Sequence, residues 1–212
     1  MTNLEFLNEF DILYNSITSN QAPGLDAYEK SALLTTYQET LVRSLYNGNI
    51  TGQSFEETEE MRRSLDVLIQ QASIPSTASN KYSLPDEVMF IIQEEVIVDK
   101  NKDCKNITIP VVPVRYDEWN RIKSNPFKGP NERRVIRLDI GRKRVELKSI
   151  YPIQFYKVSY IRYPRPIILE RLTRELSINN SKDESTCELD DSLHRIILEG
   201  AVRLAASIYK NT

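Results

Sequence analysis

Residues 117–166 read DEWNRIKSNPFKGPNERRVIRLDIGRKRVELKSIYPIQFYKVSYIRYPRP, a basic, proline-punctuated block with the alternation of β-strands. From residue 115 to residue 174 the chain carries 16 Lys and Arg against 6 Asp and Glu. The rest of the 212 residues holds 12 basic and 24 acidic side chains, and the net charge of the whole chain is −2. The near-neutral total therefore hides a strongly polarised chain.

Three segments of this block predict an antiparallel sheet. They are RRVIRLDI (133–140), KRVELKS (143–149) and QFYKVSYIRY (154–163), and each alternates apolar or aromatic side chains with charged ones. Gly141 suits a tight hairpin between the first two. At the start of the block, residues 117–124 predict a short helix capped by Asp117.

A second hairpin is predicted upstream of the block. VMFIIQEEVIV (88–98) and ITIPVVPV (107–114) are β-branched and apolar, and polar residues separate them. Pro110 and Pro113 cannot donate to a strand ladder, so we expect the second strand to lie at a sheet edge or to break early, and such an edge could pair with a neighbouring subunit.

Apolar side chains at helical spacing predict three helices before the β region and one after it. The first covers residues 3–19, and the second runs from an Asp26 cap to Asn47. The third covers residues 54–72, where Ser54 and Glu57 fit a capping box, and the last starts near Asp190.

The fold class predicted is α+β: a helical bundle of three N-terminal helices and the C-terminal helix, with an inserted antiparallel β-sheet region. The domains predicted are residues 1–75 (N-terminal helices), 76–175 (β region with the basic block) and 176–212 (loop and C-terminal helix packing on the N-terminal helices). We expect the polar loops 76–84 and 177–187 to become ordered only in a complex.

The sequence indicates no catalytic, cofactor-binding or metal-ligating constellation, and we expect that the protein is not an enzyme. Cys104 and Cys187 lack CxxC or CxH spacing, so buried or incidental thiols are favoured over a disulfide or zinc site. The single histidine, His194, is interpreted as structural. Neither GxxxxGK[ST] nor GxGxxG is present. An acidic N-terminal stretch, and apolar runs well short of about 18 residues, favour neither secretion nor a membrane span.

The candidate functional residues lie in the basic block, as an interface or a DNA-proximal surface. They are Arg133, Arg134, Arg137, Arg142, Lys143, Arg144, Tyr156, Tyr160, Arg162 and Tyr163. Contacts with another subunit or a partner protein are favoured, because a chain with one basic and one acidic part can pair head to tail, and such contacts close into rings. The alternatives are nucleic-acid binding, with tyrosines stacking on bases, and a solvated sheet face.

Four stretches resemble virion structural proteins of crAss-like tailed phages, and the resemblance extends in order over nearly the whole chain. They are residues 8–48 (NEFDILYNSITSNQAPGLDAYEKSALLTTYQETLVRSLYNG), 117–130 (DEWNRIKSNPFKGP), 160–169 (YIRYPRPIIL) and 187–205 (CELDDSLHRIILEGAVRLA).

The resemblance implies a neck or ring protein of the head-tail connector. Such a protein forms a ring of twelve copies, joins the portal and head to the tail, and surrounds the DNA channel. Its expected partners are the portal protein, other neck and tail ring proteins and the genomic DNA passing through. Its expected location is the virion neck, after assembly in the host cytoplasm. The resemblance implies no catalytic residues and no cofactor.

Overall fold

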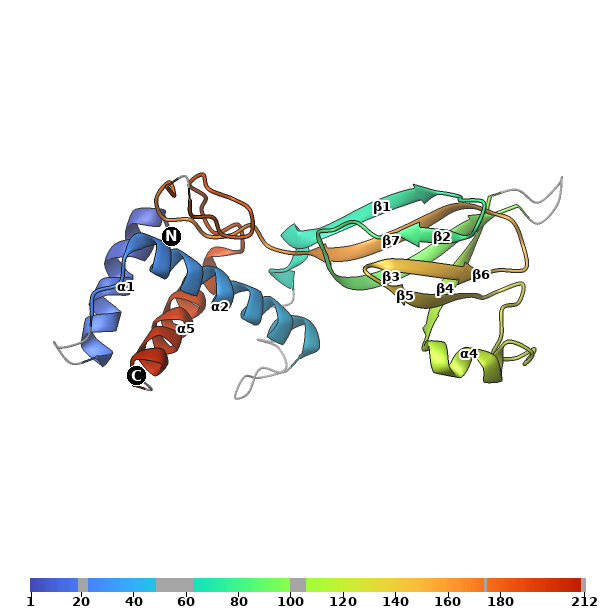
Figure 1. The fold of residues 1–212 in the computed structure, drawn as a ribbon, viewed down its shortest axis with the longest axis horizontal. Coiled ribbons are helices and arrows are strands. Elements are labelled where there is room, and N and C mark those ends of the chain that lie inside the picture. The colour runs from blue at the N-terminus through green and yellow to red at the C-terminus, as the bar shows by residue number, and fades with distance from the viewer. Residues whose placement is uncertain (19–22, 49–62, 100–105, 174, 211–212) are drawn as a thin grey trace. The chain divides into compact units, whose positions relative to one another are not determined.

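The computed structural model describes residues 1–18, 23–48, 63–99, 106–173 and 175–210. The chain divides into two compact units (Figure 1). The helical unit comprises residues 1–68 and 164–212, and the β unit comprises residues 69–163. Each unit is described by itself below.

Three helices form the helical unit: α1 (Asn3–Ile17), α2 (Ala27–Asn47) and α5 (Asp191–Lys210). Capping boxes begin the first two, one formed by Thr2 with Glu5 and the other by Asp26 with Glu29. Gly48 ends α2 in the left-handed conformation, with φ at 68°. The helices predicted at these places are therefore confirmed, including the cap at Asp26.

The core of the helical unit lies where α5 packs against α1 and α2. Fully buried side chains meet there from all three helices: Phe6, Phe10, Leu34, Val42, Leu45, Leu193, Ile197, Leu198, Ala201 and Val202. Gly200 permits a close approach of α5 to α2, because a Cβ at this position would lie 1.9 Å from Cζ of Tyr37.

An extended segment, residues 164–169, is buried except for Arg165 and is held by hydroxyls of α2. The backbone N–H of Ile167 donates to Oγ1 of Thr35 at 3.0 Å, and that of Leu169 donates to Oγ of Ser31 at 3.0 Å. Ser31 and Thr35 are four residues apart and therefore share one face of α2. These hydroxyls satisfy donors that would otherwise be buried without a partner.

His194 occupies a buried place at the start of α5. Its side chain is close to the Phe6 ring, Nε2 lies 2.9 Å from the Leu189 carbonyl oxygen, and Nδ1 lies 2.6 Å from the Met1 ammonium. The residue is 4% exposed, which confirms the structural interpretation. Burial is the main cause that lowers the pKa of His194 below its usual value.

We therefore expect stability to fall on acidification. Since the unfolded imidazole titrates near pH 6.5 and the folded one at a lower pH, this stabilising contribution is complete above about pH 6.5. It is lost as the pH falls from there through the folded pKa. Urea titrations at pH 7.5 and pH 5.5 test this, with His194→Gln as the comparison. Equal pH dependence in the variant and the wild type would contradict it.

A seven-stranded sheet forms the β unit. Its strands are β1 (Ile69–Pro75), β2 (Lys81–Ser83), β3 (Val88–Val98), β4 (Ile107–Val114), β5 (Val135–Gly141), β6 (Arg144–Lys148) and β7 (Ile153–Arg162). The strand order is β1-β7-β3-β4-β5-β6-β2, and every pairing is antiparallel except the parallel pair β4–β5. A short helix, α4 (Tyr116–Ile122), follows β4 (Figure 1).

The sheet curls until it is nearly closed around one apolar core. The ring centroids of Tyr82 and Tyr156 are 5.2 Å apart. Tyr82 belongs to the edge strand β2, whereas Tyr156 belongs to β7, which lies beside the other edge strand, β1. Val96, Val135, Val145 and Leu147 belong to the same core, together with other inward residues of the sheet. Successive side chains of a strand point to opposite faces of the sheet, so every second side chain of each strand points inward. These inward side chains meet in the core of the curled sheet.

The predicted fold class is wrong. The described chain has four helices and a seven-stranded mixed sheet, with helices towards its termini, instead of a helical bundle with an inserted antiparallel sheet. The first part of the third predicted helix, residues 54–62, lies outside the described residues. Of its remainder, Asp66–Leu68 form a 3₁₀ turn and Ile69–Pro75 form β1, which pairs along its whole length with β7. Strand pairing has overridden the helical spacing of Leu65 and Leu68, which are nevertheless buried.

Of the two alternatives expected for residues 107–114, the sheet edge is wrong, whereas the pairing with β3 does stop early, at Pro110, and the hairpin of β3 with β4 is confirmed. β4 lies inside the sheet and changes partner along its length. Residues 107–110 pair with β3, and residues 111–114 pair with β5. Each half has only one paired edge in this register, which is how Pro110 and Pro113 fit in an inner strand.

Candidate assembly interface

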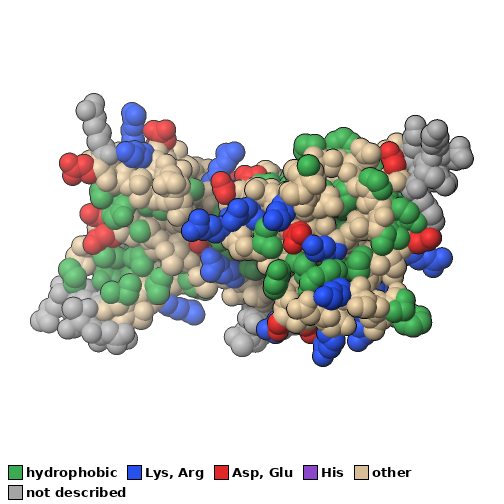
Figure 2. All heavy atoms as spheres, turned by 45° about the vertical axis from the view of Figure 1, so that its right-hand side comes forward, with side chains coloured by type: hydrophobic (Ala, Val, Ile, Leu, Met, Phe, Trp, Pro, Cys, Tyr) green, Lys and Arg blue, Asp and Glu red, His purple; other side chains and the backbone are tan. Residues whose placement is uncertain are grey.

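The two units carry opposite charge. Within residues 69–163 there are 17 Lys and Arg against 11 Asp and Glu, whereas the helical unit has 11 against 19. The net charges are therefore +6 for the β unit and −8 for the helical unit. Figure 2 shows Lys and Arg side chains beside exposed hydrophobic ones on one face of the β unit.

The tip of the β5–β6 hairpin presents three of the candidate cations: Arg142, Lys143 and Arg144, all exposed. Arg142 and Lys143 form the turn with φ values of 52° and 55°, and Gly141 before them has φ at 84°. The predicted tight hairpin is thus confirmed. Its two turn residues adopt a conformation for which Asn and Gly are the usual choices.

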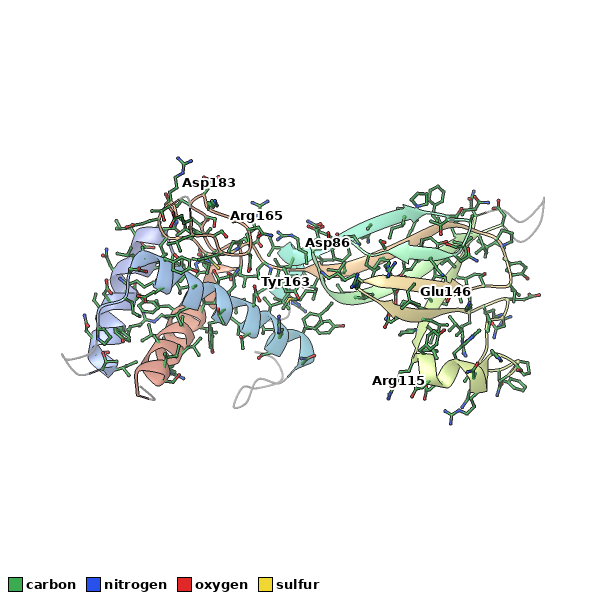
Figure 3. All side chains as sticks on the ribbon, in the orientation of Figure 1. Asp86, Arg115, Glu146, Tyr163, Arg165 and Asp183 are labelled. Atoms are coloured by element: carbon green, nitrogen blue, oxygen red, sulfur yellow. The ribbon has the colours of Figure 1, made fainter. Side chains whose placement is uncertain are left out.

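Lys143 does not project freely. Its Nζ donates to the backbone carbonyl of Asp86 and lies 5.6 Å from the centroid of the Tyr163 ring. The backbone N–H of Tyr163 donates to the Glu87 carbonyl at 2.9 Å. Asp86 and Tyr163 lie at the same end of the β unit (Figure 3), so Lys143 holds this end together.

Arg137 and Tyr156 are placed inside the β unit. Nη1 of Arg137 donates to Oε2 of Glu94 at 2.6 Å, and the Tyr156 hydroxyl donates to Oε1 of the same carboxylate. The side chains of Arg137 and Glu94 are 11% and 4% exposed, and Nε of Arg137 lies 3.3 Å from Asp139. Burial and then the Glu94 charge raise the pKa of Tyr156 well above its usual value. Arg137, Glu94 and Tyr156 therefore form a hydrogen-bonded polar cluster inside the β unit.

Tyr160 is buried as well, and Arg162 is half-buried beside it on β7. The Tyr160 hydroxyl donates to Oε1 of Glu87 at 2.6 Å. Burial, followed by this hydrogen bond, raises the pKa of Tyr160 to about 12. Tyr156 and Tyr160 thus have no ring face open to a nucleic-acid base.

Arg133 and Arg134 differ in role although they are adjacent. Arg133 is exposed, whereas the guanidinium of Arg134 donates to the carbonyl oxygens of Phe127 at 3.0 Å and Lys128 at 3.4 Å. The structure therefore gathers Arg142, Lys143 and Arg144 at one hairpin tip, and places Arg133 and Arg134 next to the loop after α4. Arg137, Tyr156 and Tyr160 lie in the interior.

Sequence reasoning missed Glu94 and Phe127. Glu94 was not among the candidate residues, yet a carboxylate in an apolar run signals a buried charge that needs a partner. Phe127 lies between Pro126 and Lys128 and is 84% exposed. The Asn-Pro and Gly-Pro pairs around it indicated a turn but not what the turn presents.

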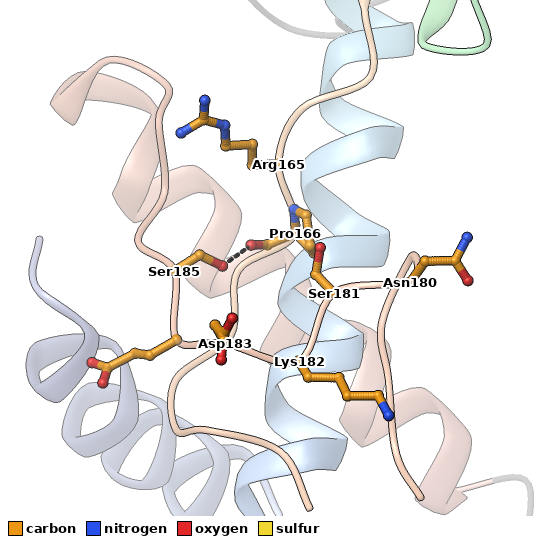
Figure 4. A pocket seen from close by; sticks show the side chains of 8 residues that line it. Arg165, Pro166, Asn180, Ser181, Lys182, Asp183 and Ser185 are labelled. Carbon is orange, nitrogen blue, oxygen red and sulfur yellow. Dashed lines mark hydrogen bonds between the residues drawn. The ribbon is translucent and has the colours of Figure 1, made fainter. Parts of the chain in front are cut away.

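One open cavity, of about 560 Å³, lies in the helical unit (Figure 4). It is lined by Arg165, Pro166 and residues 180–185, and the Ser185 hydroxyl donates to the Pro166 carbonyl. Arg171 and Asp183 are 3.5 Å apart and exposed, so they form a weak surface pair. The lining of the cavity presents backbone groups and ion-paired surface side chains. It contains no nucleophile with an adjacent base.

The loops expected to order only in a complex already have defined contacts in the described chain. Within 76–84, residues 81–83 form β2, with Tyr82 only 2% exposed. Within 177–187, Ile178 bridges to Ser181, and Cys187 is buried. Burial raises the pKa of the Cys187 thiol to about 11, so it stays protonated and unreactive. Cys104 lies outside the described residues.

Among the described residues, no three His, Cys, Asp or Glu side chains are grouped so that they could hold a metal ion. No helix in the described ranges has the length and apolar character needed to cross a membrane.

The chain thus combines an acidic helical unit with a basic β unit, and the buried polar groups described above contribute to packing. The chain belongs to the family of phage tail ring proteins described as phage tail ring protein 3/4, which matches residues 1–212.

Two relatives from Bacteroides phage crAss001 support this assignment. The chain is 41% identical to its Ring protein 3 over 218 residues, covering 97% of this chain and 95% of the relative. It is 38% identical to Ring protein 4/5 over 226 residues, covering 97% and 92%. The resemblance to ring proteins of crAss-like phages is confirmed, and the chain is a structural ring protein of a phage virion.

Proposed function

We propose that copies of this chain form a closed ring in the neck of the virion, where the ring joins the portal and head to the tail. The ring contains twelve copies and surrounds the channel through which the genomic DNA passes. Its partners are the portal protein and other ring proteins of the neck and tail. Assembly takes place in the host cytoplasm.

The opposite charge of the two units is the observation that carries this proposal. A ring subunit needs two unlike lateral surfaces, because each copy offers one surface to the preceding neighbour and the other to the next. A helical unit of −8 and a β unit of +6 provide such surfaces within one chain. Charge complementarity favours this head-to-tail arrangement and opposes contacts between like units.

Native mass measurement and electron microscopy of the purified protein test the proposal. Rings should form at about 50 mM salt and weaken towards about 500 mM, because exposed charges are screened over a shorter distance at higher salt. A protein that stays monomeric at all concentrations, and also fails to bind portal and ring proteins of its own phage, would contradict it.

Nucleic-acid binding is the second candidate, supported by the exposed Arg133, Arg142 and Arg144. With Tyr156 and Tyr160 buried, these cations offer phosphate contacts without base stacking. Affinity for duplex DNA should then fall steeply as salt increases. Absence of binding at about 50 mM salt removes this candidate.

A further inference from the structure

The loop that follows α4 presents an aromatic ring to solvent. Phe127 is 84% exposed, more than any other large hydrophobic side chain of the described residues. Exposed aromatic rings of this kind are disfavoured in water and are common anchors of protein interfaces.

The backbone around this ring is fixed by several contacts. Oδ1 of Asn125 accepts from the N–H groups of Phe127 at 2.9 Å and Lys128 at 3.2 Å, and the N–H of Gly129 donates to the Asn125 carbonyl at 2.7 Å. From outside the loop, Arg134 holds the carbonyls of Phe127 and Lys128. A loop fixed in this way loses little conformational freedom when its side chain is buried by a partner.

Gly129 is required for this tight turn. A Cβ at this position would lie 2.8 Å from the Asn125 carbonyl oxygen and 2.9 Å from that of Ile122. Both are backbone atoms, which cannot move aside without displacing α4 or the loop. A glycine, an Asx turn and an arginine together hold the apolar Phe127 side chain in its exposed position.

The charge around Phe127 defines its partner. Residues 115–134, which include α4 and this loop, carry six Lys and Arg against three Asp and Glu, so the segment around Phe127 has a net charge of +3, with Arg121 paired to Glu118 at 3.5 Å. A complementary surface combines apolar side chains with carboxylates. The helical unit of this chain has that character.

Helix α1 offers such a surface. Leu4 and Ile12 are each 68% exposed, and their spacing of eight residues places them on one line of the helix with the exposed Asn8 between them. Glu5 and Glu9 lie next to this line, where Glu5 completes the capping box with Thr2 and Glu9 is paired with Arg195 of α5 at 2.6 Å. Leu4 and Ile12 are not used by the packing of α1 against the other helices.

We infer that Phe127 in the β unit of one copy docks on the Leu4–Ile12 face of α1 in the next copy, as the apolar centre of the charge-complementary lateral contact. This inference rests on the ring proposed above. It names the residues that join neighbouring copies.

Phe127→Ala tests the anchor, with Phe155→Ala as the matched control. Phe155 is a 44% exposed phenylalanine on β7, outside the loop. We expect Phe127→Ala to raise the protein concentration needed for half-maximal ring formation at least about tenfold. The control should leave it unchanged, and both variants should keep the wild-type unfolding temperature. Gly129→Ala keeps the Phe127 side chain but distorts the loop that holds it. This variant should also raise the protein concentration needed for half-maximal ring formation.

A photoreactive benzoylphenylalanine at position 127 identifies the residues that the side chain at this position contacts. In an assembled mixture of light and heavy isotope-labelled chains, cross-links should join light to heavy copies and end within residues 4–12. Cross-links confined to single copies, or ending on other surfaces or on a portal or ring protein added to the mixture, would overturn the inference.

The two proposals fail in different ways. If the wild-type protein and Phe127→Ala form rings equally well, the proposed Phe127 contact is wrong, whereas the proposed ring assembly is retained. If the wild-type protein forms no ring, alone or with its phage partners, the ring itself is wrong, and the contact between copies falls with it.

Discussion

Replacing Arg137 with methionine is expected to lower the free energy of unfolding of the β unit by about 3–5 kcal/mol. The substitution retains the length of the side chain but removes the guanidinium that lies 2.6 Å from Glu94. The Glu94 carboxylate, 4% exposed, would then remain buried with the Tyr156 hydroxyl but no counter-charge. Trp119 is the single tryptophan of the chain and lies in the β unit, so its fluorescence during urea unfolding provides the measurement.

Two further variants isolate the cause. The double variant Arg137→Met with Glu94→Gln should recover most of the loss, because it leaves no unpaired charge. Arg144→Met, at an exposed position on β6, should change stability by no more than about 0.5 kcal/mol. A double variant as unstable as Arg137→Met alone would show that the effect comes from lost packing and not from the buried ion pair.

The second large effect is expected from removing the hydroxyls that hold residues 164–169 on α2. In the double variant Ser31→Ala with Thr35→Val, the buried N–H groups of Leu169 and Ile167 lose their acceptors. Each such loss costs about 1–3 kcal/mol. We expect a matching decrease in the stability of the helical unit, measured by circular dichroism at the helix band. Hydrogen exchange at the amides of Ile167 and Leu169 should be faster.

The matched control lies on the same helix. Thr36→Val with Thr40→Val removes two exposed hydroxyls that bond only to the preceding turn, on the carbonyls of Ala32 and Thr36. These changes should have little effect, because no buried donor is orphaned. Similar losses in the two double variants would mean that the hydroxyls of Ser31 and Thr35 do not hold the segment.

Local patterns predicted the elements whose signals are complete within a short stretch. The Asp26 cap, the helix end at Asn47 and the turn after Gly141 are examples, since capping and turn geometry depend on neighbouring residues. The short helix predicted from residue 117 is also present, as α4, but Arg115 instead of Asp117 precedes it, without a side-chain cap.

Sequence patterns failed where distant strands decide the outcome. Residues 69–75 have helix-compatible spacing, but β7 provides a strand to pair with them. The partner change along β4 requires β3 and β5 together, so Pro110 and Pro113 were misinterpreted as marks of an edge.

The candidate site shows the same division. Charge segregation was visible in the composition, because it needs no knowledge of pairing. By contrast, the burial of Arg137, Tyr156 and Tyr160 depends on the curl of the sheet, and alternation in a single strand does not show which face becomes the interior.

Cryo-electron microscopy of the neck of the phage particle that contains this chain tests the central claim most directly. The account predicts a closed ring of twelve copies between portal and tail, in which the basic β unit of each copy lies against the acidic helical unit of the next. Copies located outside the neck, or joined by contacts between like units, would contradict it.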